Sequence, residues 1–147
     1  MPMEGDPEAG PPAVVVPPQR PWVILVVDDE PDILDSFRIL LEESLPDVKV
    51  ITAPSGRKGI EILESERVDL VMSDFKMPGM DGVEFLVQAR RIRPALPRIM
   101  FTALANDDLA SRAVSEAVVS SFLSKNITPP EMVRRVGLLL HYDPPAG

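Results

Sequence analysis

Residues 68–82 read Val-Asp-Leu-Val-Met-Ser-Asp-Phe-Lys-Met-Pro-Gly-Met-Asp-Gly, and this stretch decides the fold class. Its first part, Val68–Met72, is a short, largely apolar run of the kind that forms a strand buried on both faces of a parallel sheet. Asp74 follows, and a loop containing Pro and Gly leads to apolar residues at helical spacing from Val83 to Ala89. The stretch therefore predicts a strand, a loop and a helix, with a carboxylate where the strand ends.

The same unit recurs along the chain. Short apolar runs that predict four further strands occur at Trp22–Val27, Val48–Thr52, Arg98–Thr102 and Val119–Leu123. Apolar residues at helical spacing follow every run: Ile33, Leu34, Phe37, Leu40 and Leu41; Ile60 and Leu63; Val83, Leu86, Ala89 and Ile92; Leu109, Ala113, Val114 and Ala117; Met132, Val133, Val136 and Leu140. Ser55 suits the N-cap of the second helix, and Thr128 followed by Pro129 suits that of the last. Five successive units predict an α/β fold, a parallel five-stranded sheet with five helices on its two faces.

Both ends of the chain differ in composition from this central part. Residues 1–21 hold seven of the 17 prolines and one apolar cluster, Val14–Val16, so we expect a disordered, proline-rich tail. A plain leader is favoured there over a proline-rich docking segment. Residues 143–147, Asp-Pro-Pro-Ala-Gly, are expected to form a short C-terminal tail, which leaves 22–142 as one folded domain.

The charge and the rare residue types exclude several classes of protein. The 147 residues include 15 Lys and Arg against 23 Asp and Glu, one His and no Cys, for a net charge of −8. Without Cys there is no disulfide, zinc-thiolate site, iron–sulfur cluster or Cys nucleophile. The acidic balance argues against direct nucleic-acid binding. No apolar run reaches the about 18 to 20 residues of a membrane helix and no secretory signal is recognised, so a cytoplasmic protein without membrane contact is expected.

Charged and polar residues gather where the predicted strands end. Asp28 and Asp29 follow the first strand, Asp74 the third, Thr102 ends the fourth and Lys125 follows the fifth. Ligands of such sheets bind beyond the carboxyl ends of the strands, so these side chains are expected to share one crevice. Three carboxylates there would repel one another unless a cation neutralises them, and Mg²⁺ suits an oxygen-only site. A hydroxyl and an ammonium beside the metal would complete a cradle for a phosphoryl group.

Four segments in this order resemble a known family. They are Val26-Val27-Asp28-Asp29-Glu30, the run Ser73 to Gly82, Phe101-Thr102-Ala103, and Phe122-Leu123-Ser124-Lys125. Over roughly residues 22–142 the chain resembles the receiver domains of two-component response regulators, of the chemotaxis-receiver type. The resemblance implies a flavodoxin-like, doubly wound sheet with strand order 2-1-3-4-5, an order that five successive units alone leave open.

The resemblance also implies a role for each residue at the strand ends. Asp74 would be the phosphoacceptor, taking a phosphoryl group from a histidine kinase or a phosphotransfer protein. Asp29, Asp74 and the backbone carbonyl of Lys76 would bind Mg²⁺, and Asp28 would act through a metal-bound water. The protein would catalyse only its own phosphorylation and dephosphorylation, and is therefore not expected to be an enzyme in the ordinary sense.

Phosphorylation in this family changes protein contacts. Thr102 would donate its hydroxyl to a phosphoryl oxygen, Lys125 would pair with another, and Phe122 would be the aromatic residue that switches between exposed and buried rotamers. A downstream protein would bind the face formed by the fourth helix, the fifth strand and the fifth helix. No output domain is expected after residue 142.

The chain departs from the family pattern at two places. Asn126 follows Lys125 where the family has Pro and a cis bond, so either the bond is trans and the loop differs, or the loop is strained. Val118-Val119 replaces Gly-Ala, so the end of the fourth helix should be built differently. At the site itself, Lys76 and Leu104 are expected to hinder water and to prolong the phosphoryl state.

Other interpretations remain open beside this one. The chain could be a phosphate-independent interaction module with an altered switch, or a receiver module cut from a larger regulator or hybrid kinase. An aspartyl-phosphate phosphatase of the dehalogenase type would need Asp-x-Asp after the first strand, and a dinucleotide-binding protein a Gly-rich turn. Arg90, Arg91 and Arg93 are expected to form a solvated helix face, and His141 to be a surface residue without a role.

Overall fold

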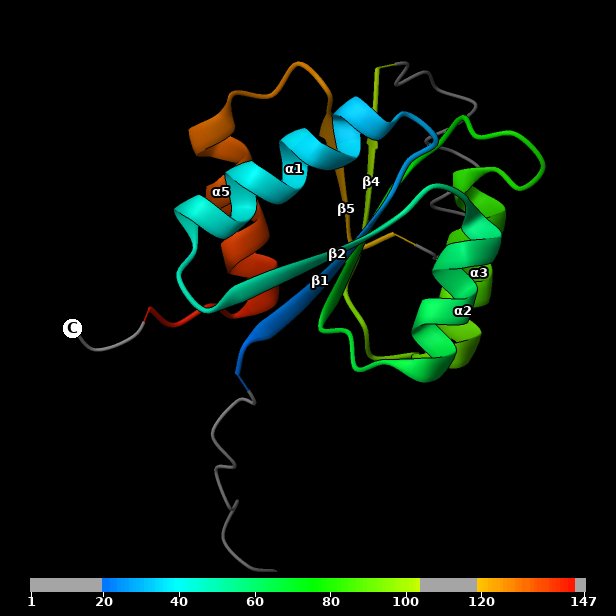
Figure 1. Cartoon of the computed structure of the whole chain (residues 1–147), viewed down its shortest axis with the longest axis horizontal. Coiled ribbons are helices and arrows are strands. Elements are labelled where there is room, and N and C mark those ends of the chain that lie inside the picture. The colour runs from blue at the N-terminus through cyan, green and yellow to red at the C-terminus, as the bar shows by residue number, and fades with distance from the viewer. Residues whose placement is uncertain (1–19, 104–118, 145–147) are drawn as a thin grey trace, which may run out of the picture.

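The computed structural model describes residues 20–103 and 119–144 (Figure 1). The strands are β1 (Trp22–Val27), β2 (Val48–Ala53), β3 (Leu70–Asp74), β4 (Arg98–Thr102) and β5 (Ser121–Ser124). The helices are α1 (Pro31–Ser44), α2 (Gly56–Ser65), α3 (Gly82–Ile92) and α5 (Pro129–Leu140). All strand pairs are parallel and their order is β2-β1-β3-β4-β5, which confirms the predicted fold class and strand order.

Two of the strands begin later than their apolar runs. β3 begins at Leu70 and β5 at Ser121, each two residues after the predicted start. Before β3, the side chain of Asp69 accepts the Val23 N–H at 2.7 Å, and its own N–H donates to the Val23 carbonyl at 2.7 Å. Hydrogen bonding to β1 therefore begins at Asp69, where a side-chain carboxylate takes the place of a backbone acceptor, and Asp74 is the last residue of β3.

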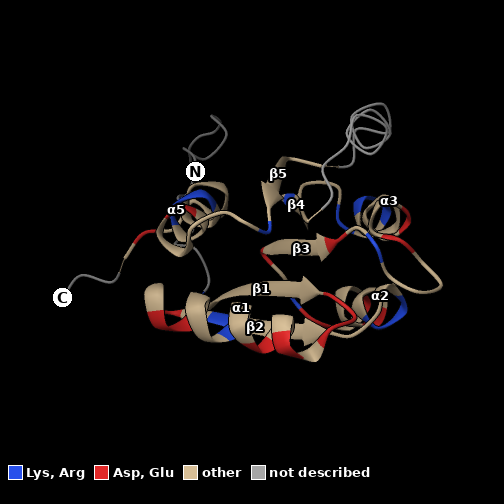
Figure 2. Ribbon diagram, turned by 90° about the horizontal axis from the view of Figure 1, so that it is seen from above, with Lys and Arg blue, Asp and Glu red and all other residues tan. Residues whose placement is uncertain are grey.

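The helices form two layers around the sheet. α1 and α5 cover one face and α2 and α3 the other, as Figures 1 and 2 show. Each face has its own apolar core, the first including Leu41, Phe101 and Val136 and the second Leu63, Phe85 and Leu86. The fourth predicted helix, with Leu109, Ala113, Val114 and Ala117, lies outside the described residues.

Capping side chains begin the helices where the sequence predicts. The Ser55 hydroxyl accepts the Lys58 N–H, and the Thr128 hydroxyl accepts the Glu131 N–H. On α3, Asp81 and Glu84 form a reciprocal capping box, each side chain accepting the other's backbone N–H at 2.9 Å. Within residues 20–103 and 119–144, no helix has the length and apolar character needed to cross a membrane.

Contacts between the first and last described segments close the amino-terminal edge of the sheet. The Trp22 ring lies 4.9 Å from that of Tyr142, and Arg20 stacks over Trp22 at 4.8 Å. Arg20 also pairs with Asp47 at 3.4 Å and donates to the Asp143 carbonyl at 3.4 Å. Arg20 therefore packs on the domain although it falls within the predicted tail, and the domain boundaries at residues 22 and 142 stay a prediction.

Candidate functional site

Three carboxylates meet at the carboxyl edge of the sheet. Asp28 and Asp29 follow β1 and Asp74 ends β3, so acidic segments of neighbouring strands lie side by side (Figure 2). One oxygen from each of the three carboxylates lies within 4.8 Å of the others. Asp28 is fully buried, Asp74 is 7% exposed and Asp29 is exposed. The structure thus brings together the three residues that the sequence predicts as metal ligands.

Asp28 is held by one backbone donor and one cation. Its Oδ1 accepts the Glu30 N–H at 2.8 Å, and its Oδ2 lies 3.2 Å from Lys125 Nζ. Burial raises the pKa of Asp28 and the Asp74 charge adds to this, while the Glu30 N–H and Lys125 act in the opposite direction. The net effect is a raised pKa, so the ionised form of Asp28 is held at some cost to the fold.

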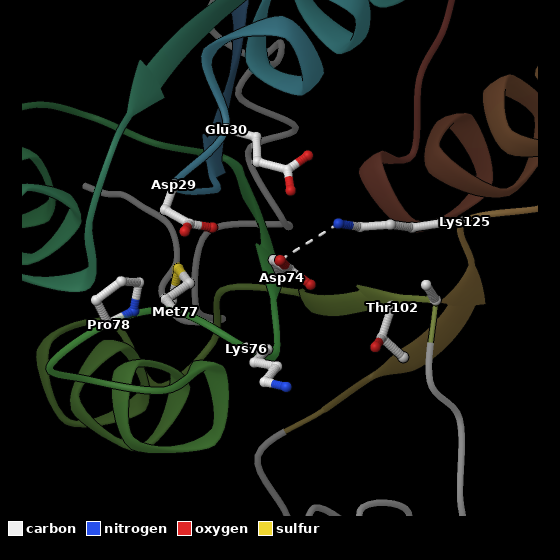
Figure 3. Close-up of a pocket in the computed structure, with 9 residues that line it drawn as sticks. Asp29, Glu30, Asp74, Lys76, Met77, Pro78, Thr102 and Lys125 are labelled. Carbon is white, nitrogen blue, oxygen red and sulfur yellow. Dashed lines mark ion pairs between the residues drawn. The ribbon is translucent and has the colours of Figure 1, made fainter.

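Asp74 also faces Lys125. Its Oδ1 accepts the Phe75 N–H at 2.8 Å, and its Oδ2 lies 3.3 Å from Lys125 Nζ (Figure 3). Burial by itself lowers the pKa of Lys125, but Asp74 and Asp28 outweigh burial and the pKa is raised. The ammonium is therefore firmly charged, and it partly neutralises two of the three carboxylates.

Glycine at position 82 allows the loop after β3 to fold over the end of the strand. The Gly82 N–H donates to the Phe75 carbonyl at 2.7 Å, which closes the loop. A Cβ at this position would lie 2.2 Å from the Asp74 carbonyl oxygen, a distance at which atoms overlap. The absence of a side chain thus lets α3 begin directly against Asp74.

A pocket of about 500 Å³ opens above these residues (Figure 3). Its lining consists of Asp29, Glu30, Asp74, Lys76, Met77, Pro78, Thr102, Ala103 and Lys125. Thr102 ends β4 and is 4% exposed, whereas Lys76 is exposed. Four further lining residues belong to the motifs quoted above, although the sequence predicts no role for them: Glu30, Met77, Pro78 and Ala103.

The donor set of this pocket fits a hard divalent cation. The carboxylate oxygens of Asp28, Asp29 and Asp74 are close enough to share one ion, and no thiol exists in the chain to favour a softer metal. A buried carboxylate with a raised pKa next to two others is the situation that a bound cation relieves. The residues therefore fit Mg²⁺.

The loop after β5 has a trans peptide bond after Lys125, the first of the two alternatives that the sequence leaves open. Among residues 20–103 and 119–144, the peptide bond between Arg20 and Pro21 is the one in the cis form, so the Lys125–Asn126 bond is trans. The Ile127 N–H donates to the Ser124 carbonyl at 3.0 Å, closing a turn around Lys125 and Asn126. The lysine reaches the site without a cis bond.

Two other predicted features are only partly described. Phe122 is half-buried and packs, like Val119, against the core on the α2 and α3 face. Leu104 is predicted to flank the site and Val118 to lie near the end of the fourth helix, and both lie outside the described residues.

The prediction that Arg90, Arg91 and Arg93 form a solvated face is wrong for Arg93, and Arg90 is half-buried. Arg93 donates to the carbonyls of Leu63 and Glu66 at 3.0 and 3.1 Å, so it caps the C-terminal end of α2 instead of lying free in solvent. Arg91 is exposed as predicted. His141 is exposed as well, but it ends α5 in the left-handed conformation, with φ 57°.

The fold and the site together define the class of this protein. A parallel 2-1-3-4-5 sheet with an acidic triad, a threonine and a lysine at its carboxyl edge is the arrangement of a receiver. The model of the response regulator receiver domain family matches residues 24–137, and the chain belongs to this family.

Individual relatives agree with this assignment. The chain is 32% identical to the transcriptional regulatory protein GlrR of Escherichia coli K12 over 127 residues, which cover 86% of this chain but only 28% of GlrR. The signal receiver domain of an HD domain-containing protein from Pseudomonas fluorescens Pf-5 is similar over 84% of this chain and 96% of that one, with TM-score 0.77 and 28% identity. TrrA of Thermotoga maritima, solved in complex with Mg²⁺ and BeF, is similar over 80% of this chain and 98% of that one, with TM-score 0.72 and 27% identity.

Proposed function

We propose that this receiver accepts a phosphoryl group on Asp74 from a histidine kinase or a phosphotransfer protein and thereby changes its protein contacts. The observation that carries the proposal is the position of Asp74, whose carboxylate lies in an open pocket 3.3 Å from an ammonium and beside two further carboxylates. Receivers in general interact with histidine kinases and downstream effectors, and family membership supports the same for this chain.

Each of three pocket residues would have its own role in phosphoryl transfer. Oδ2 of Asp74 would attack phosphorus, forming a P–O bond as the P–N bond to the donor histidine breaks and the imidazole leaves. Lys125 and the Thr102 hydroxyl would each meet an oxygen of the transferred group, as preorganised charge and hydrogen-bond donors. Such a protein would act on itself only, as acceptor and slow hydrolase, and not as an enzyme for other substrates.

Mg²⁺ would be held by Asp29, Asp74 and the backbone carbonyl of Lys76. Asp28 would contribute through a water. When bound, this ion neutralises charge on the transferring phosphoryl oxygens. The protein would otherwise have to bring a phosphoryl group to a cluster of three carboxylates, two of which pair with Lys125. The acidic cluster therefore supports a magnesium-dependent reaction.

The phosphorylated state would be transmitted by Thr102 and Phe122. Movement of Thr102 toward the phosphoryl group would open space for the half-buried Phe122 ring to move inward. Partner proteins would bind β5, α5 and the fourth predicted helix, and the proposal includes no direct contact with nucleic acid or membrane. The protein would work in the cytoplasm and receive the phosphoryl group there.

The proposal is tested by incubating the protein with acetyl phosphate and Mg²⁺ and measuring intact mass. We expect one acid-stable, base-labile phosphoryl group on the wild type and on Asp35→Asn, a control on the exposed side of α1. Asp74→Asn should carry none. An unmodified wild type, with the residues of the site folded, would favour a phosphate-independent interaction module, and an adduct that survives in Asp74→Asn would reject the assignment of the acceptor.

A further inference from the structure

A short turn fixes the backbone of Lys125 with no proline to help. The Asn126 N–H donates to the Ser124 hydroxyl at 3.0 Å, and the Ile127 N–H donates to the Ser124 carbonyl at 3.0 Å. The Lys125 N–H donates to the Thr102 carbonyl at 3.1 Å, continuing the β4 and β5 pairing by one residue. Hydrogen bonds at Lys125 and at the two residues after it thus fix the backbone from which the lysine side chain extends.

The side chain itself extends over an aromatic ring. Lys125 Nζ lies 5.4 Å from the centroid of Phe101, within the range of a cation–π contact. The Phe101 ring is 1% exposed and packs against Phe37 of α1, with ring centroids 4.6 Å apart and an interplanar angle of 54°. The ring beneath the ammonium is therefore a fixed surface, wedged between β4 and α1.

A cavity lies beside the Phe101 ring and the Lys125 side chain. An apolar cavity of about 90 Å³ is lined by Phe37, Leu40, Phe101, Leu123, Ser124, Lys125, Ile127, Pro129 and Met132. Lysine has four freely rotating bonds, so its ammonium keeps one position only where neighbouring groups hold it. Phe101 is the residue of this lining whose ring lies beneath the ammonium.

The ring also acts independently of the charge of the carboxylates. Asp28 and Asp74 attract the ammonium, but this attraction weakens when a cation binds them. The face of a phenyl ring attracts a cation in every such state. It can therefore hold Lys125 in place when the pocket is loaded.

We infer that Phe101 is the positioning residue of Lys125: its ring holds the ammonium above the site, on a backbone fixed by the Ser124 turn. This role of Phe101 rests on the proposed function, in which Lys125 meets a phosphoryl oxygen. Because Phe101 precedes Thr102 on β4, one strand end supplies both the hydroxyl and the support for the lysine.

The first test separates the binding of the phosphoryl group from the binding of the metal. Beryllofluoride stands in for the phosphoryl group, and its affinity in saturating Mg²⁺ is compared for the wild type, Phe101→Leu and Phe37→Leu by calorimetry. Loss of the cation–π contact should weaken beryllofluoride binding by about fivefold in Phe101→Leu. The Mg²⁺ affinity of this variant should not fall. Phe37→Leu removes a ring from the same pair but leaves the one beneath Lys125, and it should change neither affinity by more than about twofold.

The second test needs neither metal nor phosphoryl group. In metal-free protein, the rate at which an amine-acylating reagent labels each lysine is followed by mass spectrometry. Phe101→Leu should label faster at Lys125 alone, because its ammonium leaves the carboxylates more often. Lys49, Lys58 and Lys76 are internal controls, since general loosening of the fold would change their rates as well.

The outcomes distinguish this inference from the proposed function. A wild type that binds no beryllofluoride in Mg²⁺ rejects the proposed function and the positioning role with it. A wild type that binds beryllofluoride rejects the positioning role alone if Phe101→Leu and Phe37→Leu behave alike, if Mg²⁺ affinity falls in step with beryllofluoride affinity, or if the labelling rate of Lys125 is unchanged.

Discussion

At the scale of single residues, Asp28 illustrates how the site and the stability of the fold oppose each other. It is a fully buried carboxylate whose pKa is raised above its ordinary value of 3.8. A raised pKa means that the folded state binds this proton more tightly than the unfolded state. The stabilising contribution is complete below 3.8 and is lost as pH rises through the raised pKa, so at neutral pH the ionised side chain weakens the fold.

Asp28→Asn should therefore stabilise the metal-free protein at neutral pH. The asparagine oxygen can still accept the Glu30 N–H, while the buried charge is gone. We expect the Tm in a chelating buffer at pH 7 to rise by about 3 °C, and the difference from wild type to shrink as pH falls. Thermal melts between pH 4 and 8 measure this, with Asp35→Asn as the control. A difference that does not change with pH would contradict the role of Asp28 ionisation.

At the scale of elements, the sequence predicts what depends on local chemistry. β1 and β4 have the predicted bounds, and the caps Ser55 and Thr128 act as predicted, because apolar runs and capping residues act within a few positions. The acidic triad could also be predicted, since parallel strands bring their carboxyl ends to one edge. Each of these conclusions needs only neighbouring residues or the direction of a strand.

What could not be predicted depends on contacts between distant segments. The start of β3 is delayed because Asp69 bonds to β1, 46 residues earlier in the chain. The support of Lys125 by Phe101 requires the alignment of β4 and β5, and no local pattern signals it. The sequence predicts a solvated Arg93 because the packing of α2 against α3 is not visible in the sequence of either helix.

Arg93 gives the prediction that belongs to this scale. Because its guanidinium donates to two carbonyls at the end of α2, Arg93→Ala should lower the free energy of unfolding by about 1 kcal/mol. Arg91→Ala removes the same chemical group from an exposed position on α3, two residues earlier, and should change stability by less than about 0.5 kcal/mol. Urea unfolding curves compare the two, and equal effects would show that the carbonyl contacts contribute nothing.

At the scale of the whole molecule, strand β1 connects the acidic site to Trp22 at the opposite end of the sheet. The acidic triad lies at the carboxyl edge, while Trp22, the one tryptophan of the chain, begins β1 at the opposite edge. Six residues of strand separate them, or roughly 20 Å. Every residue of β1 is buried and its neighbours β2 and β3 pair along it, which predicts that the two ends unfold together.

Binding of Mg²⁺ should therefore stabilise the region of Trp22 as much as the site itself. An ion at a hundredfold excess over its Kd adds about 2.7 kcal/mol to the stability of the state that binds it. We expect the urea midpoints from Trp22 fluorescence and from far-UV circular dichroism to rise equally. Asp29→Asn combined with Asp74→Asn should abolish both shifts. A shift in circular dichroism alone would mean that the domain unfolds in parts.

The contacts of Arg20 predict that this domain tolerates circular permutation. The Arg20 side chain reaches the carbonyl of Asp143, so the segments before β1 and after α5 lie close together. Folds whose ends adjoin tolerate circular permutation and insertion into other proteins, since a few linking residues span the gap. A variant joined between residues 143 and 20 and opened in a surface loop should keep the same sheet, with its acidic edge facing away from the join.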